Sequence, residues 1–222
     1  MPRLAFVTGG ARGIGAAICA ELERRGCRVI APPRSELDLA RPASIDAYLD
    51  SHAGLEVDIL VNNAGINVLN AIQEIDAGTW QSMLQVNLSA ALRLVKFFGP
   101  GMAARGWGRI LSISSVLGLV ARERRAAYSM TKAALDALTR TAAVEFGPAG
   151  VLANSLAPGF VDTDLTRLNN SPQVLAGLQA AIPLRRLAAP AELAKVAAFL
   201  VSEENTYLTG QVICVDGGFT CL

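Results

Sequence analysis

Short apolar runs alternate with amphipathic segments along the start of the chain. Leu4 to Val7 is an unbroken apolar run, which is typical of a parallel strand buried on both faces. From Ile14 to Arg25 apolar residues recur every three or four positions, so this segment is predicted to be a helix that Gly26 ends. A second strand is predicted from Arg28 to Ala31. The chain therefore opens as strand, glycine turn, helix and strand.

The same alternation continues and predicts a single α/β domain over residues 1–222. Further strands are predicted over 58–62, 109–114, 151–156 and 211–215, with helices over 79–105 (one long helix or two in sequence), 125–146 and 191–200. This order is typical of a Rossmann-type, doubly wound parallel sheet, whose ligands bind beyond the carboxyl ends of the strands. The interval around 160–190 is predicted to form a mobile substrate lid.

Composition and charge exclude several classes of protein. Lys plus Arg number 20 against 19 Asp plus Glu, and the formal net charge of +1, without a dense basic run, predicts no binding to nucleic acid or membrane. No apolar stretch is long enough to span a bilayer, so we expect a cytoplasmic protein. The four cysteines contain no Cys-x-x-Cys pair and are expected to be reduced, buried thiols. The single histidine, His52, is expected near a helix end, and no metal site is predicted.

The turn after the first strand has the composition of a phosphate-binding loop. Thr8 to Gly15 reads Thr-Gly-Gly-Ala-Arg-Gly-Ile-Gly and joins a strand to a helix. Backbone N–H groups at a helix start attract anions, and glycines let a pyrophosphate approach the main chain. After the second strand, where selectivity for NAD usually rests on an acid, the chain carries Arg34. Together with Arg12 it offers two guanidinium groups to a 2′-phosphate, which predicts NADP(H) in preference to NAD(H).

A tyrosine and a lysine form a candidate acid/base pair. Tyr128 and Lys132 are four residues apart in a predicted helix, so both side chains project from one face. An ammonium beside a phenol favours the phenolate, which predicts a lowered pKa for Tyr128 and an acid/base role. Asn62 to Gly65, Ser114 to Ser115 and Pro158 to Gly159 end three predicted strands, and we expect them at the same edge of the sheet.

Taken together, these motifs resemble the short-chain dehydrogenase/reductase family over essentially the full chain. The glycine turn is similar to that family's Thr-Gly-x-x-x-Gly-x-Gly element, residues 62–65 to its Asn-Asn-Ala-Gly element, and residues 128–132 to its Tyr-x-x-x-Lys motif. The match extends to Pro158-Gly159 and to the closing segment 210–218. The resemblance implies a catalytic tetrad of Asn87, Ser115, Tyr128 and Lys132, with Ser115 preferred to Ser114 for its spacing from the tyrosine.

The resemblance also implies where the cofactor binds and what each member of the tetrad does. Tyr128 would protonate the carbonyl oxygen, Ser115 would stabilise the developing charge, Lys132 would hold the nicotinamide ribose, and Asn87 would anchor a water. The residues implied to contact the dinucleotide are Gly9, Arg12, Gly13, Ile14, Gly15, Arg34, Asp38, Asn63, Ala64, Gly65, Tyr128, Lys132, Pro158, Gly159, Val161 and Thr163.

Within that family the pattern is most similar to 3-oxoacyl-carrier-protein reductases. This implies NADPH-dependent reduction of a 3-oxoacyl compound or another apolar ketone, carried as an acyl carrier protein or coenzyme A thioester. Arg105 and the group Arg122, Arg124 and Arg125 are candidates for contact with an acidic carrier, or else a solvated basic face. Cleft residues are expected to be mostly apolar, namely Val116, Leu117, Phe160, Leu165 and Leu168.

Two other functions are compatible with the same residues. The same residues would serve NAD-dependent oxidation of a sugar, a polyol or another secondary alcohol, and a catalytically idle module that senses dinucleotides would keep the same fold. Apolar faces on the Ala-rich helices predict a homodimer or homotetramer.

The chain departs from the family pattern after the second predicted strand. Only the five residues from Pro32 to Glu36 separate that strand from Leu37-Asp38-Leu39, whereas a parallel crossover needs a dozen or more. We therefore predict a sheet without its usual outer strand, or with that strand displaced, and an edge blunted by the two prolines. The resemblance places Asp38 against the adenine.

Overall fold

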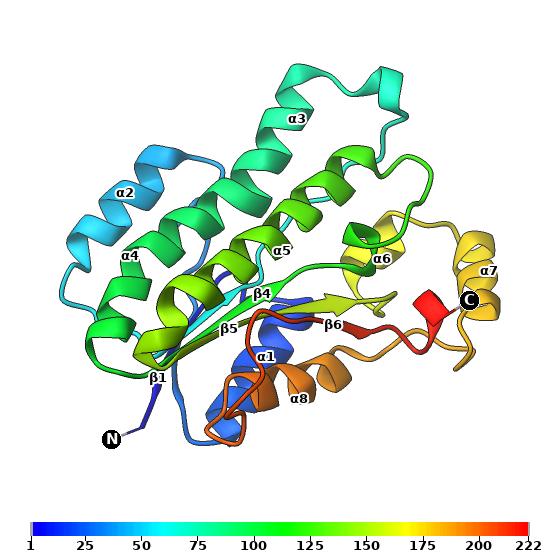
Figure 1. Cartoon of the computed structure of the whole chain (residues 1–222). Coiled ribbons are helices and arrows are strands. Elements are labelled where there is room, and N and C mark those ends of the chain that lie inside the picture. Colours follow the sequence, from blue (N-terminus) through cyan, green and yellow to red (C-terminus); the bar gives the residue numbers. More distant parts are fainter. Residues whose placement is uncertain (1, 222) are drawn as a thin grey trace.

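The protein forms one parallel sheet with helices on both faces, in a computed structural model that describes residues 2–221 (Figure 1). The strand order is β2-β1-β3-β4-β5-β6, and every neighbouring pair is parallel. The strands are β1 Leu4–Val7, β2 Arg28–Ile30, β3 Ile59–Asn62, β4 Gly108–Ile113, β5 Val151–Pro158 and β6 Val212–Val215. Strand order reverses between β1 and β3, where a sheet of this kind opens a crevice for ligands.

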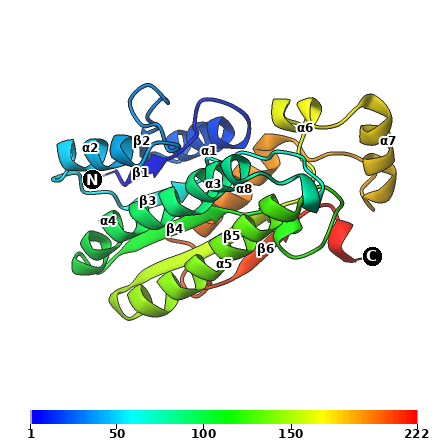
Figure 2. The same cartoon turned by 90° about the horizontal axis from the view of Figure 1, so that it is seen from above.

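Helices cover the sheet in two layers (Figures 1 and 2). The helices are α1 Gly13–Arg24, α2 Pro42–Ser51, α3 Ala77–Leu84, α4 Ala90–Ala104, α5 Ala126–Phe146, α6 Asp164–Leu168, α7 Pro172–Ala181 and α8 Pro190–Leu200. The layer with α4 and α5 covers one face, and α1 and α8 cover the other. Helices α6 and α7 project past the carboxyl ends of the strands, in the interval predicted to be a lid (Figure 2).

Each face of the sheet contributes to a separate apolar core. On one face Phe6 and Leu60 pack with Leu94 of α4, and on the other Val7 packs with Ile18 of α1. Successive residues of a strand point to opposite faces, so Phe6 and Val7 of β1 enter different cores. A strand buried on both sides needs apolar residues at every position, which is why β1 shows no polar alternation.

The sequence predicted most elements to within a few residues of their observed ends. The segment predicted over 79–105 is continuous from α3 to α4 through a π-helix, Gln85–Ser89. Helix α2 had not been predicted. His52 lies directly after α2, where its ring stacks on Tyr48 with the ring centroids 4.2 Å apart, so its expected place near a helix end is confirmed.

The expected loss of the outer strand is confirmed. β2 is the edge of the sheet, and residues 37–39 form no strand. A single turn replaces the crossover, since the backbone N–H groups of Glu36 and Leu37 both donate to the carbonyl of Pro33. Leu37 is buried in the core, and the carbonyl of Leu39 accepts from Gln85 Nε2 at 2.9 Å. The shortened segment therefore packs over the end of α3 instead of extending the sheet.

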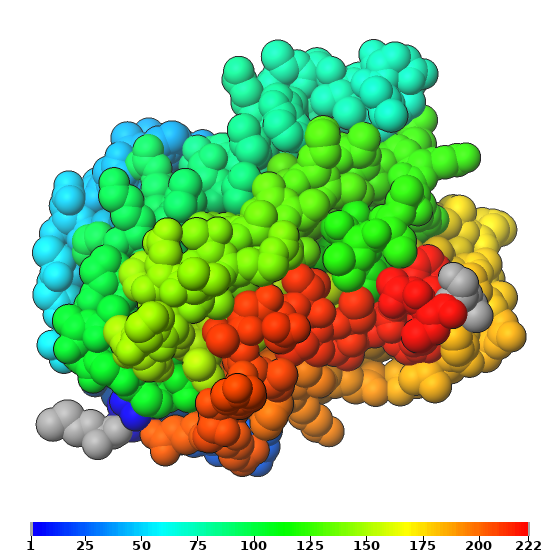
Figure 3. All heavy atoms as spheres, viewed as in Figure 1, coloured from blue at the N-terminus to red at the C-terminus, as the bar shows by residue number. Residues whose placement is uncertain are grey.

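The cysteines are all free, but only two of them are partly buried. Cys19 and Cys27 are partly buried, while Cys214 and Cys221 are exposed, so the prediction of buried thiols is wrong for the last two. Cys214 lies on β6, an edge strand whose segment reaches the surface (Figure 3, orange to red). Over residues 2–221, no helix is long and apolar enough to cross a membrane, and no group of three or more His, Cys, Asp or Glu side chains is placed to hold a metal ion.

Candidate active site

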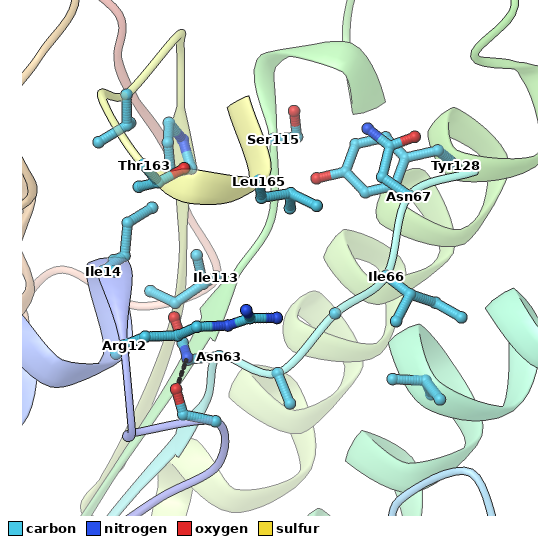
Figure 4. Close-up of a pocket in the computed structure, with 18 of the residues that line it drawn as sticks. Arg12, Ile14, Asn63, Ile66, Asn67, Ile113, Ser115, Tyr128, Thr163 and Leu165 are labelled. Carbon is cyan, nitrogen blue, oxygen red and sulfur yellow. Dashed lines mark hydrogen bonds between the residues drawn. The ribbon is translucent and has the colours of Figure 1, made fainter. Parts of the chain in front are cut away.

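A cleft of about 820 Å³ opens at the carboxyl ends of the strands (Figure 4). Its wall is built from the glycine turn after β1, the shortened segment after β2, the ends of β3, β4 and β5, and the helix α6. Every residue predicted to contact the dinucleotide lines this cleft, and so does Ser115. Residues of the predicted lid, including those of α6, line the same cleft as Ser115, Tyr128 and Lys132.

The first turn of α1 presents free backbone donors to the cleft. Arg12 precedes the helix without capping it through its side chain, and the first turn holds no acid. A Cβ on Gly15 would lie 2.2 Å from the carbonyl oxygen of Gly9, and Gly13 has a φ of +57°. An uncapped helix start whose first turn contains two glycines fits a pyrophosphate, because the N–H groups carry partial positive charge.

The end of β3 holds the glycine turn in place. Asn63 Nδ2 donates to the carbonyl oxygens of Thr8 at 2.8 Å and of Gly9 at 3.1 Å (Figure 4). The Thr8 hydroxyl accepts from the backbone N–H groups of Asn63 and Ala64 at 3.0 and 3.1 Å. The amide of Asn63 thus acts on the turn itself, which fixes the N-terminus of α1 relative to the sheet.

Arg12 and Arg34, the two arginines predicted to bind a 2′-phosphate, both line the cleft. Arg12 extends into the cleft (Figure 4). Arg34 is 81% exposed, and its Nε lies 3.3 Å from Asp38 Oδ1. That oxygen also accepts from the backbone N–H of Ala40 at 3.1 Å. Arg34 therefore shares its charge with Asp38, and the ion pair is weak because it is solvated.

Tyr128, Lys132 and Ser115 meet in the middle of the cleft. Lys132 Nζ donates to the carbonyl of Ile113 at 2.7 Å and lies 5.7 Å from the centroid of the Tyr128 ring. The Ser115 hydroxyl accepts a hydrogen bond from the backbone N–H of Leu117 at 3.1 Å. Hydrogen bonding by the same hydroxyl lowers the pKa of Tyr128. Tyr128 and Lys132 come from one face of α5, as their spacing predicted, and Ser115 comes from the end of β4.

The structure corrects the predicted acidity of the tyrosine. Burial raises the pKa of Tyr128 above its ordinary value of 10.0, and the Ser115 hydroxyl and the charge of Arg125 offset only part of that rise. The prediction of a lowered pKa for Tyr128 is wrong, because desolvation of the phenolate outweighs the groups that favour it. Tyr128 is therefore protonated at neutral pH, the form that donates a proton to a carbonyl oxygen.

Burial lowers the pKa of Lys132, whereas it raises that of Tyr128. Desolvation lowers the pKa of Lys132 from 10.5 to about 8, and the carboxylate of Asp136, one turn further along α5, opposes that shift. The ammonium is thus present below about pH 8 and lost as the pH rises through that value. Asp136 is itself buried, and its own pKa is raised by desolvation.

We expect this lysine to set the alkaline limb of activity. If the chain catalyses the carbonyl reduction that the resemblance implies, its kcat/KM should fall above about pH 8, since the cation beside Tyr128 is lost there while the tyrosine, with a raised pKa, stays protonated. Replacing Lys132 with Arg, which does not deprotonate, should remove that limb at the cost of a lower maximum. A wild-type profile that stays flat to pH ~10 would show that Lys132 carries no such charge requirement.

Asn87 is placed behind the cleft wall. It lies in the π-helix, a rare element that often occurs at functional sites, and it is buried. Its amide exchanges hydrogen bonds with the backbone of Ile66, at 2.8 and 2.9 Å, and donates to Thr131 Oγ1 at 3.0 Å. A Cβ on Gly65 would lie 3.4 Å from both Asn87 Oδ1 and Lys132 Nζ, so these two groups flank the same backbone position. Its water-anchoring role stays a prediction.

The predicted apolar lining of the cleft and the predicted basic group are each only partly present in the structure. Leu168 is 80% exposed and does not line the cleft, although the other four predicted apolar residues do. Arg105 lies at the far end of the sheet, where it donates to the carbonyl of Val57 at 2.6 Å, so it shares no surface with residues 122–125. Arg125 is only 4% exposed and lines the cleft, so it is not part of a solvated basic face.

Sequence reasoning missed several cleft residues besides Arg125. Asn67, Asn169 and Asn170 also line the cleft, and Asn169 Nδ2 reaches the carbonyl of Asn67 at 3.5 Å, linking the end of α6 to the loop after β3. Arg125 is the N-cap residue of α5, three residues before Tyr128, and its backbone is not helical. The sequence marks neither Arg125, which belongs to a basic cluster, nor the asparagines as cleft residues.

Comparisons with known proteins agree with this geometry. A family model described as Enoyl-(Acyl carrier protein) reductase matches residues 32–220. The 3-oxoacyl-acyl-carrier-protein reductase FabG of Escherichia coli is 37% identical, over 97% of this chain and 96% of its own length. The acetoacetyl-CoA reductase of Cupriavidus necator is 35% identical, over 97% of each chain.

Solved structures match over nearly the whole chain. A putative NAD(P)-dependent gluconate 5-dehydrogenase from Beutenbergia cavernae, with bound NADP, has a TM-score of 0.94 and 36% identity, covering 99% of this chain and 97% of its own. A gluconate 5-dehydrogenase from Burkholderia cenocepacia, in complex with NADP and tartrate, has a TM-score of 0.94 and 31% identity, covering 99% and 96%. The chain belongs to the short-chain dehydrogenase/reductase family and is an NAD(P)-dependent oxidoreductase.

Proposed function

We propose that this protein uses NADPH to reduce a carbonyl compound to a secondary alcohol, with Tyr128 as the general acid. The observation that carries the proposal is the meeting of Tyr128, Ser115 and Lys132 in the cleft that also holds the uncapped N-terminus of α1. NADPH, when bound, supplies a hydride to the carbonyl carbon. The glycine turn and the residues after β3 and β5 would hold it.

The residues of the chain then supply the proton and the electrostatic stabilisation. The protonated Tyr128 donates its phenolic proton to the carbonyl oxygen, and the Ser115 hydroxyl donates a hydrogen bond to the same oxygen as negative charge develops there. The Lys132 ammonium, buried one helical turn away, stabilises the phenolate that remains. The cleft therefore contains a donor for each charge that appears during the reaction.

The relatives support two substrate classes. The named activities of the FabG and acetoacetyl-CoA reductase relatives support a 3-oxoacyl group carried by acyl carrier protein or coenzyme A, and Val116, Leu117 and Phe160 give the cleft apolar walls for it. The gluconate 5-dehydrogenase structures support a polyhydroxy acid, which this site would oxidise in the reverse direction. Both classes use the same catalytic residues.

A substrate panel with both reduced cofactors tests the proposal. Purified protein is assayed with 3-oxoacyl thioesters, simple ketones and oxo acids, while NADPH or NADH oxidation is followed by absorbance. We expect NADPH-dependent reduction of at least one class, with the corresponding alcohol identified by mass spectrometry. Absence of turnover with every ketone, together with measurable NADPH binding, would support a dinucleotide-sensing module and overturn the proposal.

Replacing Arg34 with Asp should reverse the cofactor preference. The substitution removes a guanidinium group that would meet a 2′-phosphate and adds a second carboxylate beside Asp38. We expect kcat/KM for NADPH to fall about 10- to 100-fold while that for NADH is kept or improved. Arg41→Asp makes the same charge change at an exposed position outside the cleft and should leave the ratio unchanged. An unaltered NADPH to NADH ratio in Arg34→Asp would remove Arg34 as the selectivity residue.

A further inference from the structure

A buried arginine without a partner lines the reacting end of the cleft. Arg125 immediately precedes α5 and is 4% exposed, and its Nε and Nη1 atoms are buried without a hydrogen-bond partner among the described residues. No acid described in the structure forms an ion pair with it. A guanidinium carries five donors, accepts nothing and does not lose its proton in proteins, so it has no way to neutralise itself. Its burial is unfavourable unless an anion enters the cleft.

A second arginine adds to the positive charge. Arg122 Nη1 is also buried without a partner, and its guanidinium lies 5.2 Å from the centroid of the Phe160 ring, which lines the cleft. Desolvation lowers the pKa of Arg125, and the positive charge of Arg122 lowers it further because like charges repel. Within residues 2–221 neither arginine has an acidic partner, so an anion entering the cleft would find two guanidinium groups able to form charge-assisted hydrogen bonds.

The positive charge of Arg125 influences Tyr128, the proposed general acid. Arg125 lies three residues before Tyr128, and its positive charge lowers the pKa of the Tyr128 hydroxyl. Other polar groups converge on the same cleft, including the buried and unpartnered Oδ1 of Asn67, which is free to accept from a hydroxyl. The acids on the cleft wall are Asp38, which pairs with Arg34 at the adenosine end, and Asp164 at the start of α6.

We propose that Arg125, assisted by Arg122, binds a carboxylate of the substrate, so that the physiological substrate is an oxo or hydroxy carboxylic acid. This inference rests on the proposed carbonyl reduction and names its substrate class. A carboxylate matches the planar fork of a guanidinium in a bidentate pair, whereas a 3-oxoacyl thioester has no charge near its carbonyl group. It also revises the expectation, drawn from the apolar residues around the cleft, that the substrate is an apolar ketone.

The test compares each oxo acid with its own methyl ester. Wild-type protein, Arg125→Gln and Arg125→Lys are assayed with NADPH on a series of oxo acids that differ in the chain length between carbonyl and carboxylate. We expect Arg125→Gln to lose about 30-fold or more in kcat/KM on the best acid and to change little on its ester, with partial recovery in Arg125→Lys. Arg124→Gln is the matched control, because Arg124 is exposed and pairs with Glu74 at 3.3 Å outside the cleft.

Two further measurements separate the outcomes. Without substrate, Arg125→Gln should raise the Tm by a few °C at most or leave it unchanged, because the variant removes a buried charge that has no partner. In the presence of NADP⁺, the acid that wild type reduces best should raise the Tm of wild type and not that of Arg125→Gln. A clear fall in Tm for Arg125→Gln alone would show that the arginine is structural and would overturn the proposal.

The assays also distinguish the proposal from its alternatives. Equal losses on acid and ester would mean that Arg125 acts through the acidity of Tyr128 and not through the substrate. A loss confined to acetoacetyl-CoA, with none on the phosphate-free acetoacetyl-N-acetylcysteamine thioester, would identify the anion as a phosphate. Either result overturns the carboxylate assignment and leaves carbonyl reduction intact, whereas no turnover on any ketone overturns the proposed function itself.

Discussion

Tyr128→Phe should abolish carbonyl reduction while NADPH still binds. The substitution removes the one hydroxyl proton donor on α5 that faces the cleft, and we expect kcat to fall by about 10³-fold or more, near the upper range for loss of a general acid. NADPH affinity, measured by fluorescence titration, should change by less than about threefold, because the glycine turn and the adenosine end are untouched.

A companion variant shows that the loss comes from proton transfer. Ser115→Ala keeps the phenol and removes only a hydrogen bond to the oxyanion, so its expected loss is smaller, about 10²-fold. The Tyr128→Phe protein should also melt close to wild type, since the ring and its packing remain. Retention of more than a few per cent of wild-type kcat in Tyr128→Phe would remove Tyr128 from its role as the general acid.

Gly15→Ala should destroy the dinucleotide site. A Cβ at this position would lie 2.2 Å from the carbonyl oxygen of Gly9 and 2.4 Å from Asn63 Nδ2, closer than atoms can approach. The start of α1 must then move away from the glycine turn and from the amide that holds it. We expect the NADPH dissociation constant to rise at least about tenfold and the free energy of unfolding to fall by about 1–3 kcal/mol.

The control for this variant is a glycine without neighbours. Gly54 lies beyond α2, and nothing would meet a Cβ placed there, so Gly54→Ala should leave both NADPH affinity and stability unchanged. Titration and thermal unfolding are run on both variants together. Wild-type affinity in Gly15→Ala would mean that the close approach of α1 to the glycine turn plays no part in cofactor binding.

Most of the fold could be predicted because its strands are buried on both sides. A strand such as β1 must be apolar at every position, and the glycine turn that follows it has few other structural explanations. The missing outer strand was also predictable, since five residues after β2 cannot carry a parallel crossover. Helix α2 was missed even though Pro42 starts it and Ile45, Tyr48 and Leu49 mark a buried face, the pattern used for the other helices.

The sequence predicted which residues form much of the candidate site, but it did not predict their pKa values or their burial. Motif spacing brought Ser115, Tyr128 and Lys132 into one cleft, but the pKa of Tyr128 depends on how much water surrounds it, and spacing carries no such information. The same limit applies to Arg125. As sequence it belongs to a basic cluster, which usually means a solvated surface, and only the folded chain shows that it is buried and lines the same cleft as Tyr128.

Isotope transfer tests the central claim most directly. The wild-type protein is incubated with an accepted ketone and with NADPH that carries deuterium at the transferable position of the nicotinamide ring, and the product alcohol is analysed by mass spectrometry. The account predicts a single deuterium on the carbinol carbon, none of it exchanged with water, and no product from Tyr128→Phe. Alcohol formed without that deuterium, or formed equally well by the Tyr128→Phe protein, would contradict it.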